Sequence, residues 1–176
     1  ITWRHAAMAA VLFITTASLI VSTRGQTAIW KDSYTLWTTT LERRPDTPIA
    51  HANLAVILNK QGDFERAREH ALASLARLPG NRAGHLALAR AAMELGDLPT
   101  AERHLRIGIE IGDAVGKRDP ALMVSLATVL TRQQRYDEAE EIHRAVVALQ
   151  PSVAEWHYAL AGFLASRGRF EEAKAP

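Results

Sequence analysis

The stretch from Pro48 to Asn81 reads PIAHANLAVILNKQGDFERAREHALASLARLPGN and predicts two α-helices joined by a short turn. Gly62 and Asp63 mark the turn, because glycine suits the left-handed residue that ends a helix and aspartate suits the N-cap of the next one. Apolar residues recur at helical spacing on both sides of this turn. They are Leu54, Ala55 and Leu58 before it and Phe64, Ala67, Ala71 and Leu75 after it. The stretch therefore predicts a helical hairpin.

This hairpin recurs along the chain. The dipeptide Leu-Ala returns after 34, 38 and 34 residues, at Leu54-Ala55, Leu88-Ala89, Leu126-Ala127 and Leu160-Ala161. Alanines of the second helix keep the same intervals, at Ala67, Ala101, Ala139 and Ala173. One hairpin cannot bury its apolar faces alone, so hairpins with this period are expected to stack. Small alanines at the crossing let the paired helices approach closely.

These residues resemble the tetratricopeptide repeat (TPR) family. The resemblance divides the chain from residue 48 onward into units at 48–81, 82–115, 120–153 and 154–176, the last of them incomplete. It implies an all-α solenoid of helical hairpins wound as a right-handed superhelix. Two features depart from the family pattern. Gln134 replaces a turn glycine, and four residues stand where the family often has tryptophan, namely His51, His85, Met123 and His157.

The region before the repeats, residues 1–24, contains an uncharged segment from Ala6 to Thr23, AAMAAVLFITTASLIVST. As a helix its 18 residues would span about 27 Å, close to the ~30 Å hydrocarbon core of a bilayer. We therefore predict a transmembrane helix. A signal or anchor peptide and a buried core helix are the alternatives. Arg4 and Arg24 balance each other, so charge does not set the orientation.

Residues 25–47 resemble the second half of a degenerate repeat. Trp30 and Trp37 stand 34 residues before Phe64 and Ala71, which belong to the second helix of the first hairpin. We expect this segment to form a helix that caps the first hairpin, because terminal units of solenoids cover the exposed face of the array.

The order of a hydrophobic helix, the sequence WKDSYTLW at residues 30–37 and TPR units is similar to one group of membrane proteins. These are polytopic glycosyltransferase-like proteins with C-terminal TPRs, of the transmembrane-and-TPR O-mannosyltransferase type. The resemblance implies that the repeats lie on the extracytoplasmic side of a membrane, periplasmic or lumenal. The catalytic acidic residues of that group lie in early membrane loops, to which nothing in this chain corresponds.

Composition and motifs exclude several kinds of chemistry. The chain has no cysteine, which excludes disulfides, thiolate catalysis and Cys-ligated zinc. Its net charge of +2 comes without clustered Lys and Arg, so a nucleic-acid surface is not indicated. Of the seven histidines, His51, His85 and His157 share one repeat position and His70 and His104 share another, on separate units, and the seven form neither an HExxH motif nor a tight cluster. We predict no catalytic residue, no metal site and no cofactor.

A binding surface is the better candidate for function. In the TPR family the first helix of each unit lines a concave groove, and the resemblance assigns ten residues to it. They are Asn53, Val56, Lys60, Leu86, Arg90, Met93, Val124, Thr128, Arg132 and Tyr158. Lys60, Arg90 and Arg132 would make the groove mildly basic and favour an extended peptide of acidic or polar character. The alternative is that these are ordinary solvated charges.

The sequence thus predicts a membrane-tethered TPR scaffold that mediates protein–protein interaction, without catalytic activity in this fragment. The alternative is the non-catalytic C-terminal TPR region of a membrane-embedded glycosyltransferase that uses a lipid-linked sugar donor and a protein acceptor. Both interpretations attach the chain to a membrane through residues 6–23.

Overall fold

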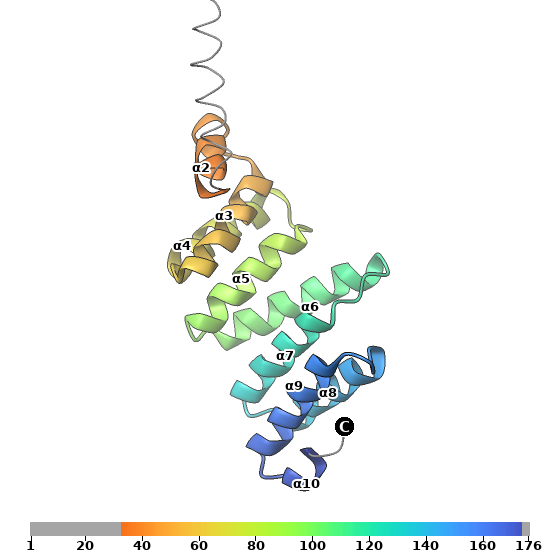
Figure 1. Ribbon diagram of the computed structural model, residues 1–176. Helices are drawn as coiled ribbons and strands as arrows, with labels where there is room; N and C mark the ends of the chain where they lie inside the picture. Colours follow the sequence, from red (N-terminus) through yellow and green to blue (C-terminus); the bar gives the residue numbers. More distant parts are fainter. Residues whose placement is uncertain (1–32, 174–176) are drawn as a thin grey trace, which may run out of the picture.

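The structure is a computed structural model, and it describes residues 33–173. Every regular element in this range is an α-helix (Figure 1). The helices are α2 (Ser33–Arg43), α3 (Pro48–Gln61), α4 (Phe64–Arg77), α5 (Arg82–Glu94), α6 (Leu98–Ala114), α7 (Pro120–Arg132), α8 (Tyr136–Leu149), α9 (Ala154–Ser166) and α10 (Phe170–Ala173).

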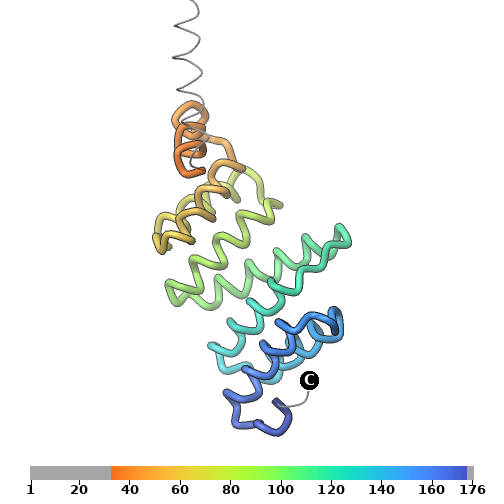
Figure 2. Tube along the Cα trace, in the orientation of Figure 1, coloured from red at the N-terminus to blue at the C-terminus, as the bar shows by residue number. Residues whose placement is uncertain are grey.

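The helices pair as antiparallel hairpins that stack in chain order. Helices α3 and α4 form the first hairpin, α5 and α6 the second, α7 and α8 the third, and α9 begins the fourth. The first helices of the units lie in one layer and the second helices in another, as the Cα trace also shows (Figure 2). The array is therefore an all-helical solenoid, as predicted.

Two turn positions explain where the helices end and begin. Gly62, Gly96 and Gly168 have φ angles of 82°, 81° and 75°, which is the left-handed region that glycine enters without steric cost. Asp63 and Asp97 then cap the following helices, because their side chains accept hydrogen bonds from the backbone N–H groups of Arg66 and Thr100.

The core consists of alanine crossings flanked by larger side chains. Ala55, Ala89 and Ala127, which stand at the Leu-Ala repeat position, are all completely buried. Their second-helix counterparts Ala67, Ala101 and Ala139 are also completely buried. Because neither helix carries a bulky side chain where it crosses its partner, the backbones approach closely, and adjacent leucines fill the space beside the crossing.

Helix α2 covers the start of the array. Its side chains Tyr34, Trp37 and Leu41 pack against a buried cluster that includes Leu54 and Leu58 of α3. Trp30 and the predicted membrane segment Ala6–Thr23 lie outside the described residues. Between residues 33 and 173, none of the helices combines the length and the apolar character that crossing a bilayer requires.

The four extra residues between the second and third units are held against the array. Arg82 Nη2 donates to Asp119 Oδ2 at 2.8 Å, and Arg82 Nε donates to the Gly108 carbonyl at 3.3 Å. The Lys117 N–H donates to the Gly112 carbonyl at 2.8 Å, which folds the loop back onto the last turn of α6. The insertion thus belongs to the packed structure.

Candidate functional site

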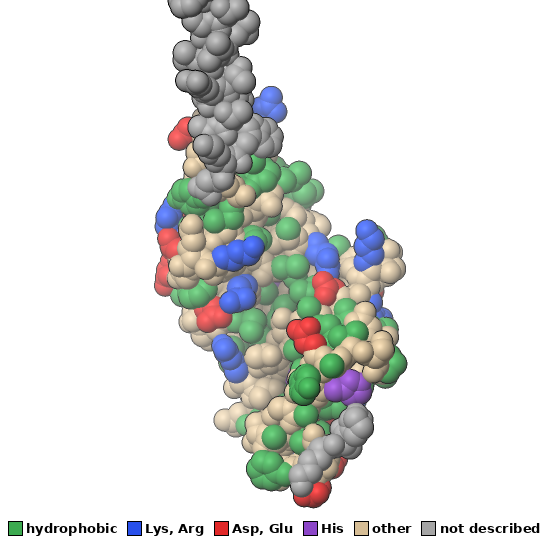
Figure 3. Space-filling view, in the orientation of Figure 1, with side chains coloured by type: hydrophobic (Ala, Val, Ile, Leu, Met, Phe, Trp, Pro, Cys, Tyr) green, Lys and Arg blue, Asp and Glu red, His purple; other side chains and the backbone are tan. Residues whose placement is uncertain are grey.

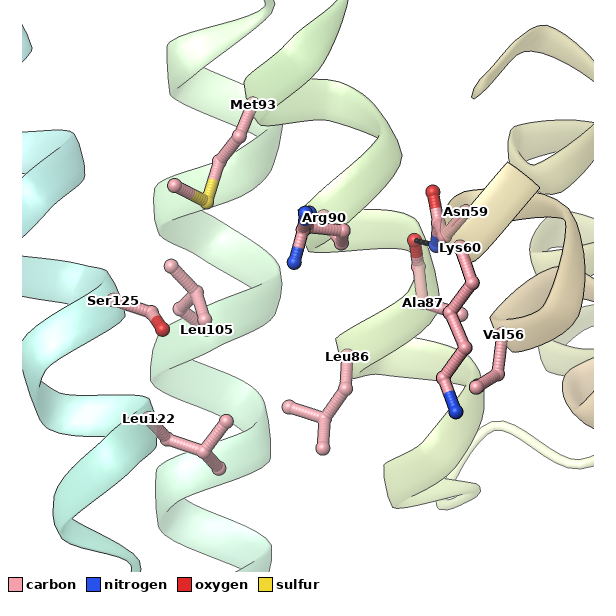
Figure 4. A pocket seen from close by; sticks show the side chains of 10 residues that line it. All are labelled: Val56, Asn59, Lys60, Leu86, Ala87, Arg90, Met93, Leu105, Leu122 and Ser125. Atoms are coloured by element: carbon pink, nitrogen blue, oxygen red, sulfur yellow. Dashed lines mark hydrogen bonds between the residues drawn. The ribbon is translucent and has the colours of Figure 1, made fainter. Parts of the chain in front are cut away.

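The first-helix layer contains a cavity of about 350 Å³ between the first three units (Figure 4). We call it the upstream cavity. It is lined by Val56, Asn59 and Lys60 of α3, Leu86, Ala87, Arg90 and Met93 of α5, Leu105 of α6, and Leu122 and Ser125 of α7. Residues from three successive units meet in it, so it exists only because the hairpins stack. Its lining is mainly aliphatic, which favours an apolar group.

Basic side chains stand at the rim of this cavity. Lys60 is exposed and has no ion-pair partner within the described part of the chain. The Arg90 side chain is 62% exposed, and its Nε lies 3.4 Å from Glu94 Oε1 one turn further along α5. Among residues 33–173, no acidic side chain lines the cavity. Figure 3 shows basic side chains and apolar surface side by side on this face of the molecule. The combination suits an apolar group that carries negative charge beside it.

Asn59 forms part of the cavity wall and joins two units. Its Nδ2 donates to the Ala87 carbonyl at 2.8 Å, which links α3 to α5. The side chain is 8% exposed, and its Oδ1 has no hydrogen-bond partner. A buried acceptor without a donor costs about 1–3 kcal/mol, so Asn59 joins the two units at some cost in stability.

A second cavity of about 310 Å³ lies one unit further along, and we call it the downstream cavity. It is lined by Val124, Thr128, Thr131 and Arg132 of α7, His143 of α8, and Ala159, Phe163 and Ser166 of α9. The hydroxyl groups of Thr128, Thr131 and Ser166 donate to carbonyls of their own helices. The three oxygens keep the capacity to accept, and they stand beside the apolar side chains of Val124, Ala159 and Phe163.

His143 closes the inner side of the downstream cavity. Its ring lies 5.2 Å from the ring of Phe163, its Nδ1 has no partner, and burial lowers its pKa. Arg132 connects the two cavities, because its Nη1 donates to the carbonyl of Met93, which lines the upstream cavity.

The ten residues assigned to the groove from sequence fall into three groups. Val56, Lys60, Leu86, Arg90 and Met93 line the upstream cavity, and Val124, Thr128 and Arg132 line the downstream cavity. Asn53 and Tyr158 line neither: Asn53 Nδ2 donates to the Ile49 carbonyl of its own helix at 2.8 Å, and Tyr158 is 77% exposed.

Some lining residues and two histidine pairs could not be predicted from the sequence. Leu105 and Leu122 line the upstream cavity although neither stands at a first-helix groove position. His51 Nδ1 lies 2.9 Å from His70 Nδ1, and His85 Nδ1 lies 2.8 Å from His104 Nδ1. Equivalent histidines recur on separate units, but the two histidines within one unit meet.

The histidine pairs link the two helices of a unit to the turn before them. His51 Nε2 and His85 Nε2 each donate to a proline carbonyl, of Pro45 and Pro79, at 2.8 Å, which occupies the other ring nitrogen. Among residues 33–173, no group of three or more His, Cys, Asp or Glu side chains is placed to hold a metal ion.

Comparison with known proteins identifies the repeat. A family model described as tetratricopeptide repeat matches residues 30–82, 86–143 and 124–175, and a second model with the same description matches residues 58–113. No curated protein sequence matches the chain.

Solved structures share the fold. The thermophilic TPR protein TTC0263 of Thermus thermophilus is 26% identical, with a TM-score of 0.65 over 89% of this chain and 81% of that chain. MamA is 13% identical, with a TM-score of 0.69 over 86% of both chains. YrrB, described as a TPR protein with an unusual peptide-binding site, is 19% identical, with a TM-score of 0.63 over 78% of this chain and 69% of that chain.

Proposed function

The chain belongs to the tetratricopeptide repeat family, and from this premise we propose that it is a protein-interaction module that binds an extended segment of a partner protein along its first-helix layer. The observation that carries the proposal is the upstream cavity, where aliphatic side chains of three units converge beside Lys60 and Arg90. Repeats of this kind present long surfaces that no single hairpin offers. The peptide-binding site named for YrrB adds support.

Site-directed photo-crosslinking tests which layer binds. A photoreactive amino acid with a small aliphatic diazirine side chain, which does not fill the upstream cavity, is expected at Val56 to capture the partner in cells. The matched control is Leu72, which is 51% exposed on α4 in the opposite layer and should capture nothing specific. Equal capture from both positions, or capture from Leu72 alone, would contradict the proposal.

Charge reversal tests the role of the basic rim. The triple variant Lys60→Glu, Arg90→Glu and Arg132→Glu is expected to lose the crosslink from Val56. A control variant that reverses Arg43, Arg44 and Lys117 changes the net charge by the same amount away from the cavities, and it should keep the crosslink. Retention of the crosslink in both variants would show that charge does not recruit the partner.

Membrane attachment through residues 6–23 is part of the proposal, with the repeats on the extracytoplasmic side. It is supported by the uncharged segment between Arg4 and Arg24. Carbonate extraction of cell membranes should leave the chain in the pellet, and deletion of residues 6–23 should release it. Protease added to spheroplasts or sealed vesicles then reports the side on which the repeats lie.

A second candidate function is the non-catalytic TPR region of a membrane-embedded glycosyltransferase, in which the repeats would present an acceptor protein. It is favoured by the sequence WKDSYTLW at residues 30–37 directly before the repeats. Several hydrophobic helices encoded upstream of residue 1 would support this candidate, whereas a signal-like start would favour the membrane-tethered scaffold.

A further inference from the structure

We propose that the upstream cavity selects an acidic segment with a single apolar anchor: one Leu, Met or Phe side chain enters the cavity, and neighbouring Asp or Glu side chains bind Lys60 and Arg90. This inference names the partner chemistry of the proposed function and rests on it. The occupant is an internal, extended segment of another protein, and its carboxylates come from side chains.

The preference for an apolar anchor side chain follows from the residues that line the upstream cavity. Leu86, Leu105 and Leu122 come from three different helices and converge with Met93 around one space (Figure 4). Methionine and leucine side chains are flexible enough to adapt to anchors of somewhat different shape. A single anchor is favoured because four large apolar side chains converge in the upstream cavity, whereas the downstream cavity has hydroxyl groups and His143 among its apolar side chains.

The preference for acidic side chains in the partner follows from two basic side chains that have few ion-pair contacts of their own. Lys60 has no ion-pair partner in the described residues, and the contact of Arg90 with Glu94 involves only Nε at 3.4 Å. The ends of Lys60 and Arg90 lie on different sides of Leu86 in the close-up (Figure 4). An anchor placed against Leu86 therefore has a cation on either side, which matches carboxylates that flank the anchor in the partner sequence.

The wall itself favours peptide N–H groups. The Ser125 hydroxyl donates to the Ala121 carbonyl, which leaves its oxygen free to accept in a cavity whose charged groups are donors. An extended peptide backbone brings N–H donors together with its side chains, whereas a small organic acid brings none.

Phage display with random dodecapeptides tests the proposal without knowledge of the partner. The intact chain is the bait, and the selected peptides are resynthesised with amidated C-termini so that only side-chain carboxylates remain. We expect enrichment of one Leu, Met or Phe flanked by Asp or Glu. Replacement of either the anchor by Ser or the acids by Asn and Gln should weaken binding about tenfold or more in fluorescence anisotropy.

Protein variants test where the selected peptides bind. Ser125→Trp fills the upstream cavity and should weaken binding about tenfold, whereas Leu72→Trp, the control on the opposite layer, should leave it within about twofold. The double variant Lys60→Gln and Arg90→Gln should weaken binding and flatten its salt dependence. Circular dichroism checks that each variant folds, and Val56→Trp replaces Ser125→Trp if that variant does not.

Each outcome separates this inference from the function on which it rests. Selected peptides without an acidic or apolar preference, or peptides insensitive to both Ser125→Trp and Val56→Trp, overturn the inference. If such peptides still lose binding in the triple variant of Lys60, Arg90 and Arg132, the proposed function stands. A selection in which no peptide is enriched contradicts both.

Discussion

At the scale of single residues, the hydrogen bonds of His85 and His104 determine where their protons lie. A carbonyl only accepts, so the 2.8 Å contact with the Pro79 oxygen requires a hydrogen on His85 Nε2. In the neutral pair, His104 Nδ1–H then donates to His85 Nδ1 at 2.8 Å. Arg103 Nη2, at 3.4 Å, faces the remaining acceptor, His104 Nε2. If both rings were charged, two N–H groups would face each other.

Acid is therefore expected to destabilise the array. The pKa of His104 falls from 6.5 to about 4 because the ring is buried and lies beside the His85 and Arg103 charges. The pKa of His70 is also lowered, by burial and by the His51 and Arg66 charges, although Glu69 acts in the opposite direction. The unfolded chain binds more protons than the folded one below pH 6.5, so stability is complete above that pH and falls as the pH falls toward 4. Between pH 7.5 and 5 we expect a loss of about 2 kcal/mol from His104.

Urea titrations at pH 7.5 and pH 5 measure this loss. Carboxyl groups with a lowered pKa, such as Glu102 and Glu140, lose most of their contribution to the free energy of unfolding below pH 5. The change in unfolding free energy between pH 7.5 and 5 therefore comes mainly from the histidines. The third unit supplies the control, because Met123 and Ile142 stand where His85 and His104 stand in the second. The double variant His85→Met and His104→Ile should reduce the pH dependence. An undiminished pH dependence in this variant would rule out the pair as its source.

Gln134 stores strain at the turn between α7 and α8. Its φ is 64°, and among residues 33–173 it is the single non-glycine residue in the left-handed region. Gly62, Gly96 and Gly168 hold the same position in the other turns. We predict that Gln134→Gly stabilises the protein by about 0.5–1 kcal/mol, because glycine removes the strain at a smaller entropic cost. Gly96→Ala, with open space around the added methyl group, should destabilise by about 1 kcal/mol in the same thermal melts. A destabilised Gln134→Gly would mean that the side chain contributes more than its strain costs.

At the scale of helices, the same ion-pair arrangement links α6 to α8 and α8 to α10. Arg135, which precedes α8, bonds Glu102 of α6 at 2.8 Å and Glu138 of its own helix at 2.6 Å. Arg169, which precedes α10, bonds Glu140 of α8 and Glu172 in the same arrangement. Arg68 and Asp97 stand at the corresponding places between the first and second units, with the charges reversed. The hydrogen bonds from Thr100 lower the pKa of Asp97 most, and the Arg103 and Arg68 charges lower it further. The second and third units, and the third and fourth, are thus joined by the same arrangement of ion pairs.

Gly112 lets the inserted loop close on the end of α6. A Cβ added at Gly112 would lie 2.7 Å from the Lys117 carbonyl oxygen, which is backbone and cannot move aside cheaply. We predict that Gly112→Ala destabilises the protein by about 1–2 kcal/mol, although alanine favours helix elsewhere. Gly162→Ala in α9, where no atom lies within 4 Å of the added Cβ, is the control and should stabilise by up to about 1 kcal/mol. Similar melting temperatures for the two variants would show that the loop opens freely.

At the scale of the whole molecule, the repeat period predicted the fold because local patterns carry it. Helical spacing, turn glycines and alanines at a constant interval specify hairpins and their stacking, and these features are visible in one sequence. Contacts between the two helices of a unit depend on their relative rotation, which the period does not specify. For this reason the pairing of His85 with His104 was missed. The sequence did not predict Leu105 and Leu122 as lining residues, because the upstream cavity forms between units.

Stability in such an array should be local, because each unit contacts only its neighbours. Trp37 of α2 packs on the cluster around Leu54 and Leu58, so Trp37→Ala should weaken the first hairpin by about 2 kcal/mol. Hydrogen exchange is expected to quicken in α3 and α4 and to stay unchanged in α8. The mirror variant is Trp156→Ala, whose Nε1 donates to Gln150 Oε1 at 2.8 Å, and it should quicken exchange near α9 alone. If both variants quickened exchange evenly from α3 to α9, the array would unfold as one cooperative unit, and the nearest-neighbour account would be wrong.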